Sequence, residues 1–139
     1  MSTIHPDDLT AMTASYIGAA LWTGLDWTGV GDSDRNPIEL DAHYCASDLT
    51  PEANEAARRT CEAFANEQMP TLERIFGPGV IDWPQVGHDL ILTRNCHGAG
   101  FWDRGYGDDG ETLTEAAQTL GENDLYPDDS GNLHWERED

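Results

Sequence analysis

The 139-residue chain contains no lysine, and its seven basic side chains, all arginine, are outnumbered by 27 acidic ones. The formal net charge is therefore −20 at pH 7. Proteins that bind the phosphates of DNA or RNA directly need a basic surface, so direct nucleic-acid binding is excluded as the main activity. The same argument excludes an anionic membrane surface. No apolar run approaches the roughly 20 residues of a membrane span, and we expect no signal peptide.

Cysteine is also scarce, with Cys45, Cys61 and Cys96 as its three positions. The number is odd, and the spacings match no zinc-binding or CxxC pattern. We therefore expect reduced thiols, as in a reducing compartment. No cofactor is expected.

The chain does contain enough apolar residues, 38%, for one domain over residues 1–139. Charge is unevenly distributed along it. Residues 1–49 hold eight acidic and one basic side chain, residues 50–102 hold seven and four, and residues 103–139 hold twelve and two. The C-terminal quarter is thus the acidic part of the domain.

Helical periodicity predicts three main helices. The first covers 7–25, and a second runs from Thr50 to Met69, with Thr50 as N-cap and proline in the first turn. A further turn is predicted at 72–76. The third helix covers 111–120 and stops at a glycine.

Alternating polarity predicts strands in the second half. Residues 86–94 form one strand, which pairs with 99–104 through a turn at 95–98. A terminal hairpin pairs 124–126 with 133–135. The predicted fold class is α+β, with N-terminal helices packed on a small antiparallel sheet that is interrupted by the third helix. The predicted core includes large apolar residues of both halves: Trp22, Phe64, Leu90, Leu92 and Phe101.

The segment 87–105, GHDLILTRNCHGAGFWDRG, concentrates the residues that carry chemistry. Its imidazoles and carboxylates suit zinc or iron, which makes His88, His97 and Asp103 the candidate metal ligands. In the predicted hairpin, however, His88 and His97 would lie on the order of 20 Å apart, at roughly 3.3 Å per residue. A shared metal site would need a bent or broken hairpin.

A structural role is the interpretation we favour for this segment. The residues expected to hold the sheet together by hydrogen bonds and ion pairs are His88, Asp89, Arg94 and Asp103. Cys96 and His97 are adjacent, whereas a catalytic Cys–His pair is usually distant in sequence. The lone GxG at 98–100 lacks the third glycine of a dinucleotide site and is predicted to serve the turn.

The same block resembles a family of small proteins of unknown function encoded by tailed bacteriophages. The likeness extends to Tyr16–Trp22 near the start and Gly121–Tyr126 near the end, so it covers most of the chain. Glycine is expected in that family where this chain has Cys96, which weakens a catalytic role for the thiol. The resemblance implies a phage accessory protein in the cytoplasm of a bacterial host, and it implies no activity and no catalytic residue.

The acidic excess has three possible meanings: solubility, salt adaptation or imitation of a nucleic acid. Carboxylates two apart on a strand lie about 6.6 Å apart, and those four apart on a helix about 6 Å, close to the phosphate spacing of DNA. The acids here cluster in turns rather than in long rows. The candidate interaction residues are aromatic and acidic side chains of the second half: Trp102, Tyr106, Asp108, Asp109, Asp128 and Asp129.

Two functions of different class follow. The first is a non-enzymatic accessory protein that binds and modulates a host protein, such as a nuclease or another nucleic-acid-binding protein. DNA mimicry or inhibition of a host defence would be its mode of action. The alternative is a small enzyme or metal-dependent hydrolase that uses the block from His88 to Asp103.

Overall fold

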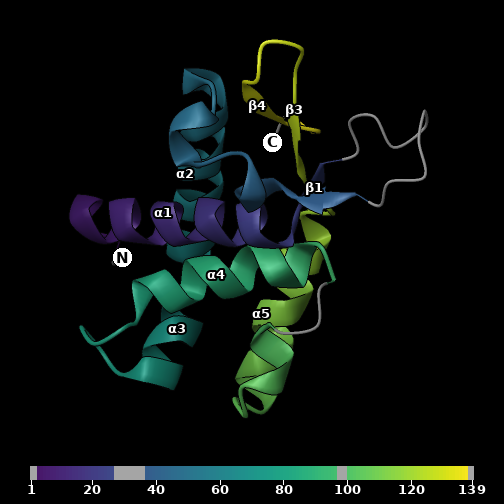
Figure 1. Cartoon of the computed structure of the whole chain (residues 1–139). Coiled ribbons are helices and arrows are strands. Elements are labelled where there is room, and N and C mark those ends of the chain that lie inside the picture. Colours follow the sequence, from purple (N-terminus) through teal and green to yellow (C-terminus); the bar gives the residue numbers. More distant parts are fainter. Residues whose placement is uncertain (1–2, 27–36, 97–99, 138–139) are drawn as a thin grey trace.

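The computed structural model describes residues 3–26, 37–96 and 100–137, and Figure 1 shows their arrangement. In this part of the chain the α-helices are α1 (Pro6–Thr23), α2 (Pro51–Glu67), α3 (Met69–Phe76), α4 (Trp83–Arg94) and α5 (Asp108–Thr119). The strands are β1 (Leu25–Asp26), β2 (Ile38–Glu39), β3 (Leu125–Pro127) and β4 (Leu133–Trp135). Single 3-10 turns are η2 (Leu40–Ala42), η3 (Ala46–Asp48) and η4 (Phe101–Asp103). The α+β class is confirmed.

Helices α1 and α2 begin where the sequence places their start signals, whereas α3 and α5 each begin three residues before the predicted position. The Thr50 hydroxyl accepts a hydrogen bond from the backbone N–H of Ala53 at 3.0 Å, and Pro51 occupies the first position of α2. At the start of α1, Nδ1 of His5 accepts from the N–H of Asp7 at 3.1 Å. These caps satisfy backbone donors that a helix end leaves unpaired. The helices predicted over 7–25, 50–69, 72–76 and 111–120 are thus confirmed as α1, α2, α3 and α5.

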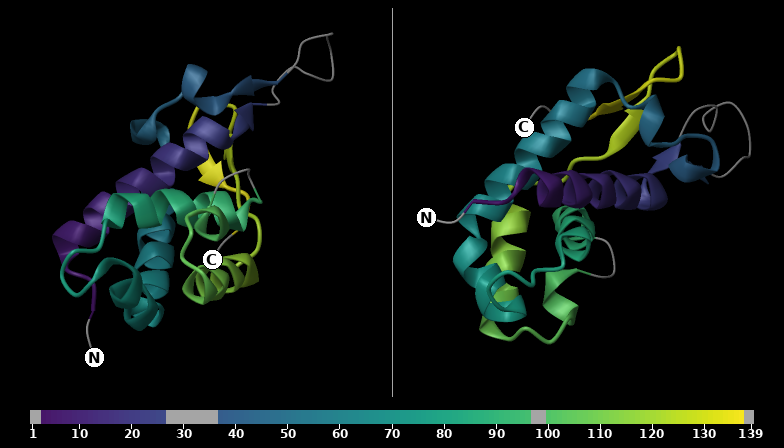
Figure 2. Two further views of the ribbon diagram at one scale, coloured as in Figure 1. Left: turned by 90° about the horizontal axis from the view of Figure 1, so that it is seen from below. Right: turned by 90° about the vertical axis from the view of Figure 1, so that its left-hand side faces the viewer.

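Helix α4 lies alongside α1 near the centre of the molecule (Figure 1, Figure 2). The two backbones approach closely at Gly87, where an added Cβ would collide with the backbone carbonyl of Met12. Helix α4 also contacts α5 and η4. It is therefore enclosed on several sides, and most of its residues are buried.

The central hairpin predicted from the sequence is wrong. Residues 86–94 belong to α4, and the 3-10 turn η4 stands where the strand 99–104 was expected. Residues 97–99, with part of the expected turn, lie outside the described residues. A helix buried all round has no polar face to mark its period, and the β-branched residues of this segment favour a strand by propensity. The separation of His88 and His97 derived from the hairpin is lost with it.

The strands form two separate two-stranded antiparallel sheets within the described residues. The predicted terminal hairpin is confirmed, with Leu125 opposite Trp135 and Pro127 opposite Leu133. The indole N–H of Trp135 donates to the backbone carbonyl of Ala53 at 2.9 Å, and its ring lies 5.5 Å from that of Tyr16. The hairpin is thereby fastened to α2 and α1 at the edge of the molecule.

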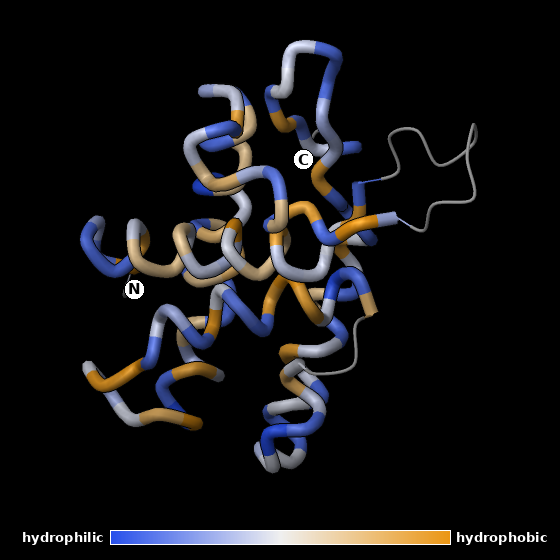
Figure 3. Tube along the Cα trace, viewed as in Figure 1, coloured by the Kyte–Doolittle hydropathy of each residue, from blue (hydrophilic) through white to orange (hydrophobic). Residues whose placement is uncertain are grey.

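The core forms where the helices meet, and hydrophobic residues occur on the helices and on the strands beside them (Figure 3). Four predicted core residues are buried: Phe64, Leu90, Leu92 and Phe101. The rings of Phe64 and Phe101 stack with centroids 5.7 Å apart, which joins α2 to η4. The prediction for Trp22 is wrong, because its neighbour Leu21 takes the inward position and Trp22 remains 56% exposed.

Candidate functional site

The central block contains an ion pair with a buried carboxylate and a partly exposed guanidinium. Asp89 on α4 is only 1% exposed, and its two carboxylate oxygens accept from the Arg104 guanidinium at 2.7 and 3.1 Å. Hydrogen bonding to this carboxylate raises the pKa of Arg104 above its ordinary value. The bidentate contact ties the segment after η4 to the centre of the molecule. The Asp89–Arg104 pair therefore stabilises the fold.

Arg94 and Asn95 form a second polar junction, at the end of α4. The buried Arg94 guanidinium donates to the Tyr16 hydroxyl at 2.9 Å and to the carbonyls of Leu120 and Gly121 at 3.1 and 2.8 Å. The side chain of Asn95 exchanges two hydrogen bonds with the backbone of Asn123. These contacts satisfy carbonyls that the end of α5 leaves without helical partners.

The candidate metal ligands do not come together. His88 stacks on the exposed ring of Trp22, with centroids 5.9 Å apart, and Asp103 accepts a hydrogen bond from the backbone N–H of Gly100 at 3.2 Å. His97 lies outside the described residues. Among the residues that the structure describes, no group of three or more histidine, cysteine, aspartate or glutamate side chains is arranged to hold a metal ion.

The predicted role of His88, Asp89, Arg94 and Asp103, to hold a sheet together, is wrong, because residues 86–94 belong to α4 and 101–103 form the turn η4. Three of them still make polar contacts: Asp89 pairs with Arg104, Arg94 joins α4 to α1 and to the end of α5, and Asp103 accepts from the backbone N–H of Gly100 at the start of η4. His88 differs, since its recorded contact is the ring stack on Trp22.

The cysteines show little sign of nucleophilic activation. Burial raises the pKa of the Cys61 thiol to about 12, which keeps it protonated at neutral pH. Cys45 and Cys96 are exposed and free. Cys96 adopts a positive φ of 56° just after α4, a conformation that suits glycine better than cysteine.

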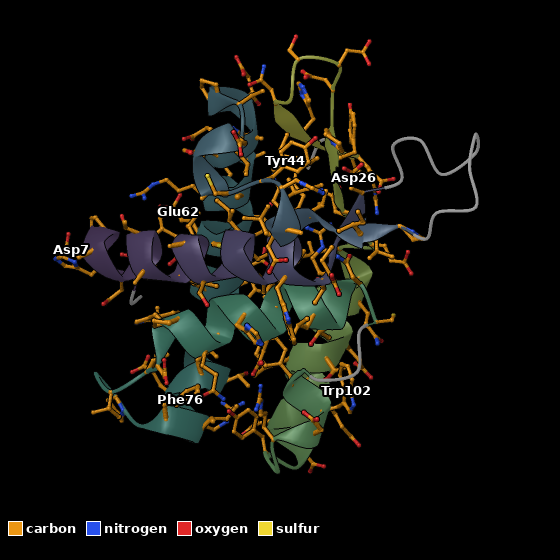
Figure 4. All side chains as sticks on the ribbon, viewed as in Figure 1. Asp7, Asp26, Tyr44, Glu62, Phe76 and Trp102 are labelled. Atoms are coloured by element: carbon orange, nitrogen blue, oxygen red, sulfur yellow. The ribbon has the colours of Figure 1, made fainter. Side chains whose placement is uncertain are left out.

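The first group of interaction candidates surrounds the start of α5. Trp102 is 44% exposed and lies beside α5 (Figure 4). Tyr106 is half-buried, with its ring against Phe76 and a hydrogen bond at 3.1 Å between its hydroxyl and the side-chain amide of Gln85. Asp109 accepts from Arg74 at 3.0 Å. Trp102 is therefore the more accessible of the two aromatic residues.

The second group lies in the turn between β3 and β4. One oxygen of Asp128 accepts from the backbone N–H groups of Ser130 and Asn132, and the other lies 2.7 Å from Nε2 of His134. These hydrogen bonds, led by that of His134, lower the pKa of Asp128 below its ordinary value. The turn and the start of α5 lie at opposite ends of the molecule (Figure 1). The six candidates therefore do not share one surface.

Two hollows that sequence reasoning missed lie along α2. One, of about 340 Å³, lies between α2 and α5, and the other, of about 630 Å³, lies between α2 and the β3–β4 hairpin. Arg59 lines both of them. The residues of α2 that line the hollows recur every three or four positions: Glu52, Ala53, Ala56, Arg59, Thr60, Ala63, Phe64 and Glu67. The sequence signal that could have indicated these hollows is the presence of small residues, such as Ala56 and Ala63, on the outer side of this amphipathic helix.

The described arginines all make internal contacts. Three form ion pairs with carboxylates, Arg59 with Glu55, Arg74 with Asp109 and Arg104 with Asp89. The other three donate to hydroxyl or carbonyl oxygens, and they are Arg58, Arg94 and Arg137. Seven arginines can neutralise at most seven of 27 carboxylates, so at least 20 have no arginine to balance them.

Comparison with protein-family models, with curated proteins and with solved structures gives no match. None of the helices in the described ranges is long and apolar enough to cross a membrane.

Proposed function

We propose that this protein is a non-enzymatic, phage-encoded accessory protein that acts in the host cytoplasm by binding a basic surface of a host protein. The observation that carries the proposal is the uncompensated charge. The chain is −20 overall, and the arginines that the structure describes are already bound to groups of the same molecule.

An unbalanced surface charge acts over a distance. It raises the association rate with a partner of opposite charge and disfavours partners of like charge. Host proteins with large basic surfaces include nucleases and other nucleic-acid-binding proteins, because their function requires contact with phosphates. Such a protein is the partner class that the charge fits best.

DNA mimicry is one form of this function. Exposed carboxylates on α1, α2 and α5 are carried on rigid helices, and Figure 4 shows Asp7 and Glu62 on the outside of α1 and α2. The paired acids at the start of α5 and in the β3–β4 turn lie at opposite ends of the molecule (Figure 1). The two ends can therefore be tested separately.

The test is retention of bacterial proteins on the immobilised chain. We expect basic nucleic-acid-binding proteins to be retained at about 0.1 M salt and released at about 1 M, where the Debye length falls from about 10 to 3 Å. Duplex DNA added as a competitor should displace them. Asp108→Asn and Asp129→Asn, one at each end, identify the end that binds.

The control is a variant with two exposed carboxylates near β2 changed to amides, Glu39→Gln with Asp41→Asn, which leaves both candidate ends and the acids of α1, α2 and α5 intact. Retention of no basic protein, or retention that neither salt nor DNA reduces, would refute the proposed function.

A further inference from the structure

The two hollows along α2 meet at Arg59, which lines both, and they are here together called the α2 groove. Its floor and walls near α5 are apolar and come from Ala63, Phe64, Ala116 and Leu120, with Arg59 and Glu67 among the other lining residues. The side near the hairpin is lined by Trp135 and Tyr126 among others. A hollow of about 340 Å³ is within the range of sites that bind organic groups, roughly 300–1,000 Å³.

The shape of the groove fits an elongated occupant. Helix α2 has 17 residues, and at 1.5 Å per residue it is roughly 25 Å long. Its groove-lining positions, Glu52, Ala56, Arg59, Ala63 and Glu67, cover four turns of the helix. Small side chains at Ala56 and Ala63 leave room for the side chains of another element to approach the α2 backbone. A second helix laid along α2 would use the whole length.

The charge around the groove selects the kind of occupant. The elements that bound it, residues 50–67 and 108–137, carry 13 acidic and three basic residues. Glu52 lines the hollow near the hairpin and Glu67 the hollow near α5, so a basic segment would meet a carboxylate in each hollow, beside Arg59 and Arg137. An acidic segment would be repelled by the same carboxylates.

We propose that the α2 groove binds an amphipathic basic helix of the partner protein, with one large apolar side chain inserted between α2 and α5. This inference rests on the proposed function and deepens it by naming the docking surface. The inserted side chain fills the apolar hollow, as anchor residues do in helix-in-groove complexes. Basic residues of the same helix pair with the flanking carboxylates.

Arg59 gives the proposal a distinctive consequence. It lines both hollows, its side chain is 57% exposed, and it lies 3.9 Å from the carboxylate of Glu55. A basic helix in the groove is repelled by this guanidinium. The neighbouring Arg58 has the same charge but points to α1, where it donates to the Thr10 hydroxyl at 3.1 Å.

The experiment uses a synthetic helical peptide as probe, with leucines and one tryptophan on one face and lysines on the other. Binding to the full-length protein is measured by calorimetry and mapped by amide chemical shifts. A peptide of the same composition in scrambled order tests the need for an amphipathic face. A peptide with glutamate in place of lysine tests the sign of the charge.

Two matched pairs of variants test the site. Ala63→Phe fills the hollow between α2 and α5, and Ala14→Phe makes the same change on the exposed side of α1. We expect Ala63→Phe to weaken binding by about ten-fold or more, as loss of an anchor contact does, and Ala14→Phe to leave it unchanged. Arg59→Ala should strengthen binding about two-fold, and Arg58→Ala should not, because of these two neighbouring arginines Arg59 lines the groove and Arg58 is bonded to α1. Circular dichroism and thermal unfolding confirm that each variant is folded.

Shift changes centred on Ala63, Ala116 and Leu120, together with these variant effects, support the inference. Equal binding by wild type and Ala63→Phe, equal binding of the glutamate peptide, shifts centred elsewhere or no binding would each overturn it. A separate result concerns the proposed function. If Ala63→Phe retains the same basic host proteins as wild type, the groove is wrong and the proposed function stands, whereas wild type that retains none refutes the proposed function itself.

Discussion

Replacing Arg104, the cation of the Asp89–Arg104 ion pair, tests most directly whether the central block stabilises the fold. Arg104→Met keeps much of the length of the side chain but leaves the Asp89 carboxylate, 1% exposed, without the two hydrogen bonds of the guanidinium. Breaking one side of a buried pair typically costs about 3–5 kcal/mol of unfolding free energy. Because the Arg104 side chain is 33% exposed and water reaches it, we expect the lower end, about 3 kcal/mol. For a chain of this length that corresponds to a fall in Tm of roughly 10 °C.

The measurement is urea unfolding followed by circular dichroism for wild type, Arg104→Met, Asp89→Leu and the double variant. A buried pair replaced on both sides by apolar residues is often close to neutral, so the double variant should be more stable than Arg104→Met. The resulting coupling energy should be about 2 kcal/mol. A loss below about 0.5 kcal/mol in Arg104→Met, or additive single effects, would show that the pair does not fasten the segment after η4 to α4.

Four further results are expected. Phe64→Ala, which empties the stack on Phe101, should cost about 3 kcal/mol in urea unfolding. The Tm should rise between about 0.01 and 0.15 M salt, because shorter Debye lengths weaken self-repulsion. At about pH 8 iodoacetamide should modify the exposed Cys45 and Cys96 and spare Cys61, whose pKa is raised by burial, until the protein unfolds. The hydrogen bonds to Asp128 lower the pKa of its carboxyl group below the ordinary value of 3.8. They therefore stabilise the fold at pH values above about 3.8. The stability difference between wild type and Asp128→Asn should therefore close as the pH falls towards about 2.

For each of these four expectations, one outcome would contradict it. A change below about 0.5 kcal/mol in Phe64→Ala would mean that α2 does not face the core. A Tm that is flat or falls with salt would show that the acids are dispersed or paired. Modification of Cys61 in the native protein, read by mass spectrometry, would contradict its burial. A gap between wild type and Asp128→Asn that persists at low pH would show that the carboxylate charge is not what stabilises the turn.

The helices that the sequence predicted correctly carry local signals. Thr50 and Pro51 define the start of α2 by capping geometry alone, and the stripe of apolar residues that follows has one buried and one exposed side. The terminal hairpin is equally local, since a short turn joins its two strands. Such elements depend little on the rest of the fold, which is why periodicity and caps are sufficient to predict them.

Helix α4 shows where local reasoning stops. Its residues from Val86 to Arg94 have no consistent polar face, because α1, α5 and η4 surround it. Only the start signal was present, in which Asp82 accepts a hydrogen bond from the N–H of Gln85 at 3.2 Å and Pro84 stands near the first turn. In the prediction from sequence, the strand propensity of the apolar run outweighed this start signal. Tertiary enclosure decided the outcome, and that enclosure is not readable from nine residues.

Some features of the candidate site could likewise be predicted from the sequence, and others could not. Charge is a sum over the sequence, so the acidic surface could be predicted without any structure. The α2 groove could not, because it requires α5 and the β3–β4 hairpin to stand apart beside the same helix. The block from His88 to Asp103 is dense in polar residues, and this density suggested the alternative of an enzyme. In the structure, the polar side chains of Asp89 and Arg94 bind other parts of the fold. A buried polar group needs a partner, and once its partner is part of the fold it is no longer available for a ligand. The exposed carboxylates and the small side chains of α2 remain accessible to another molecule, and those are the groups that the binding experiments change.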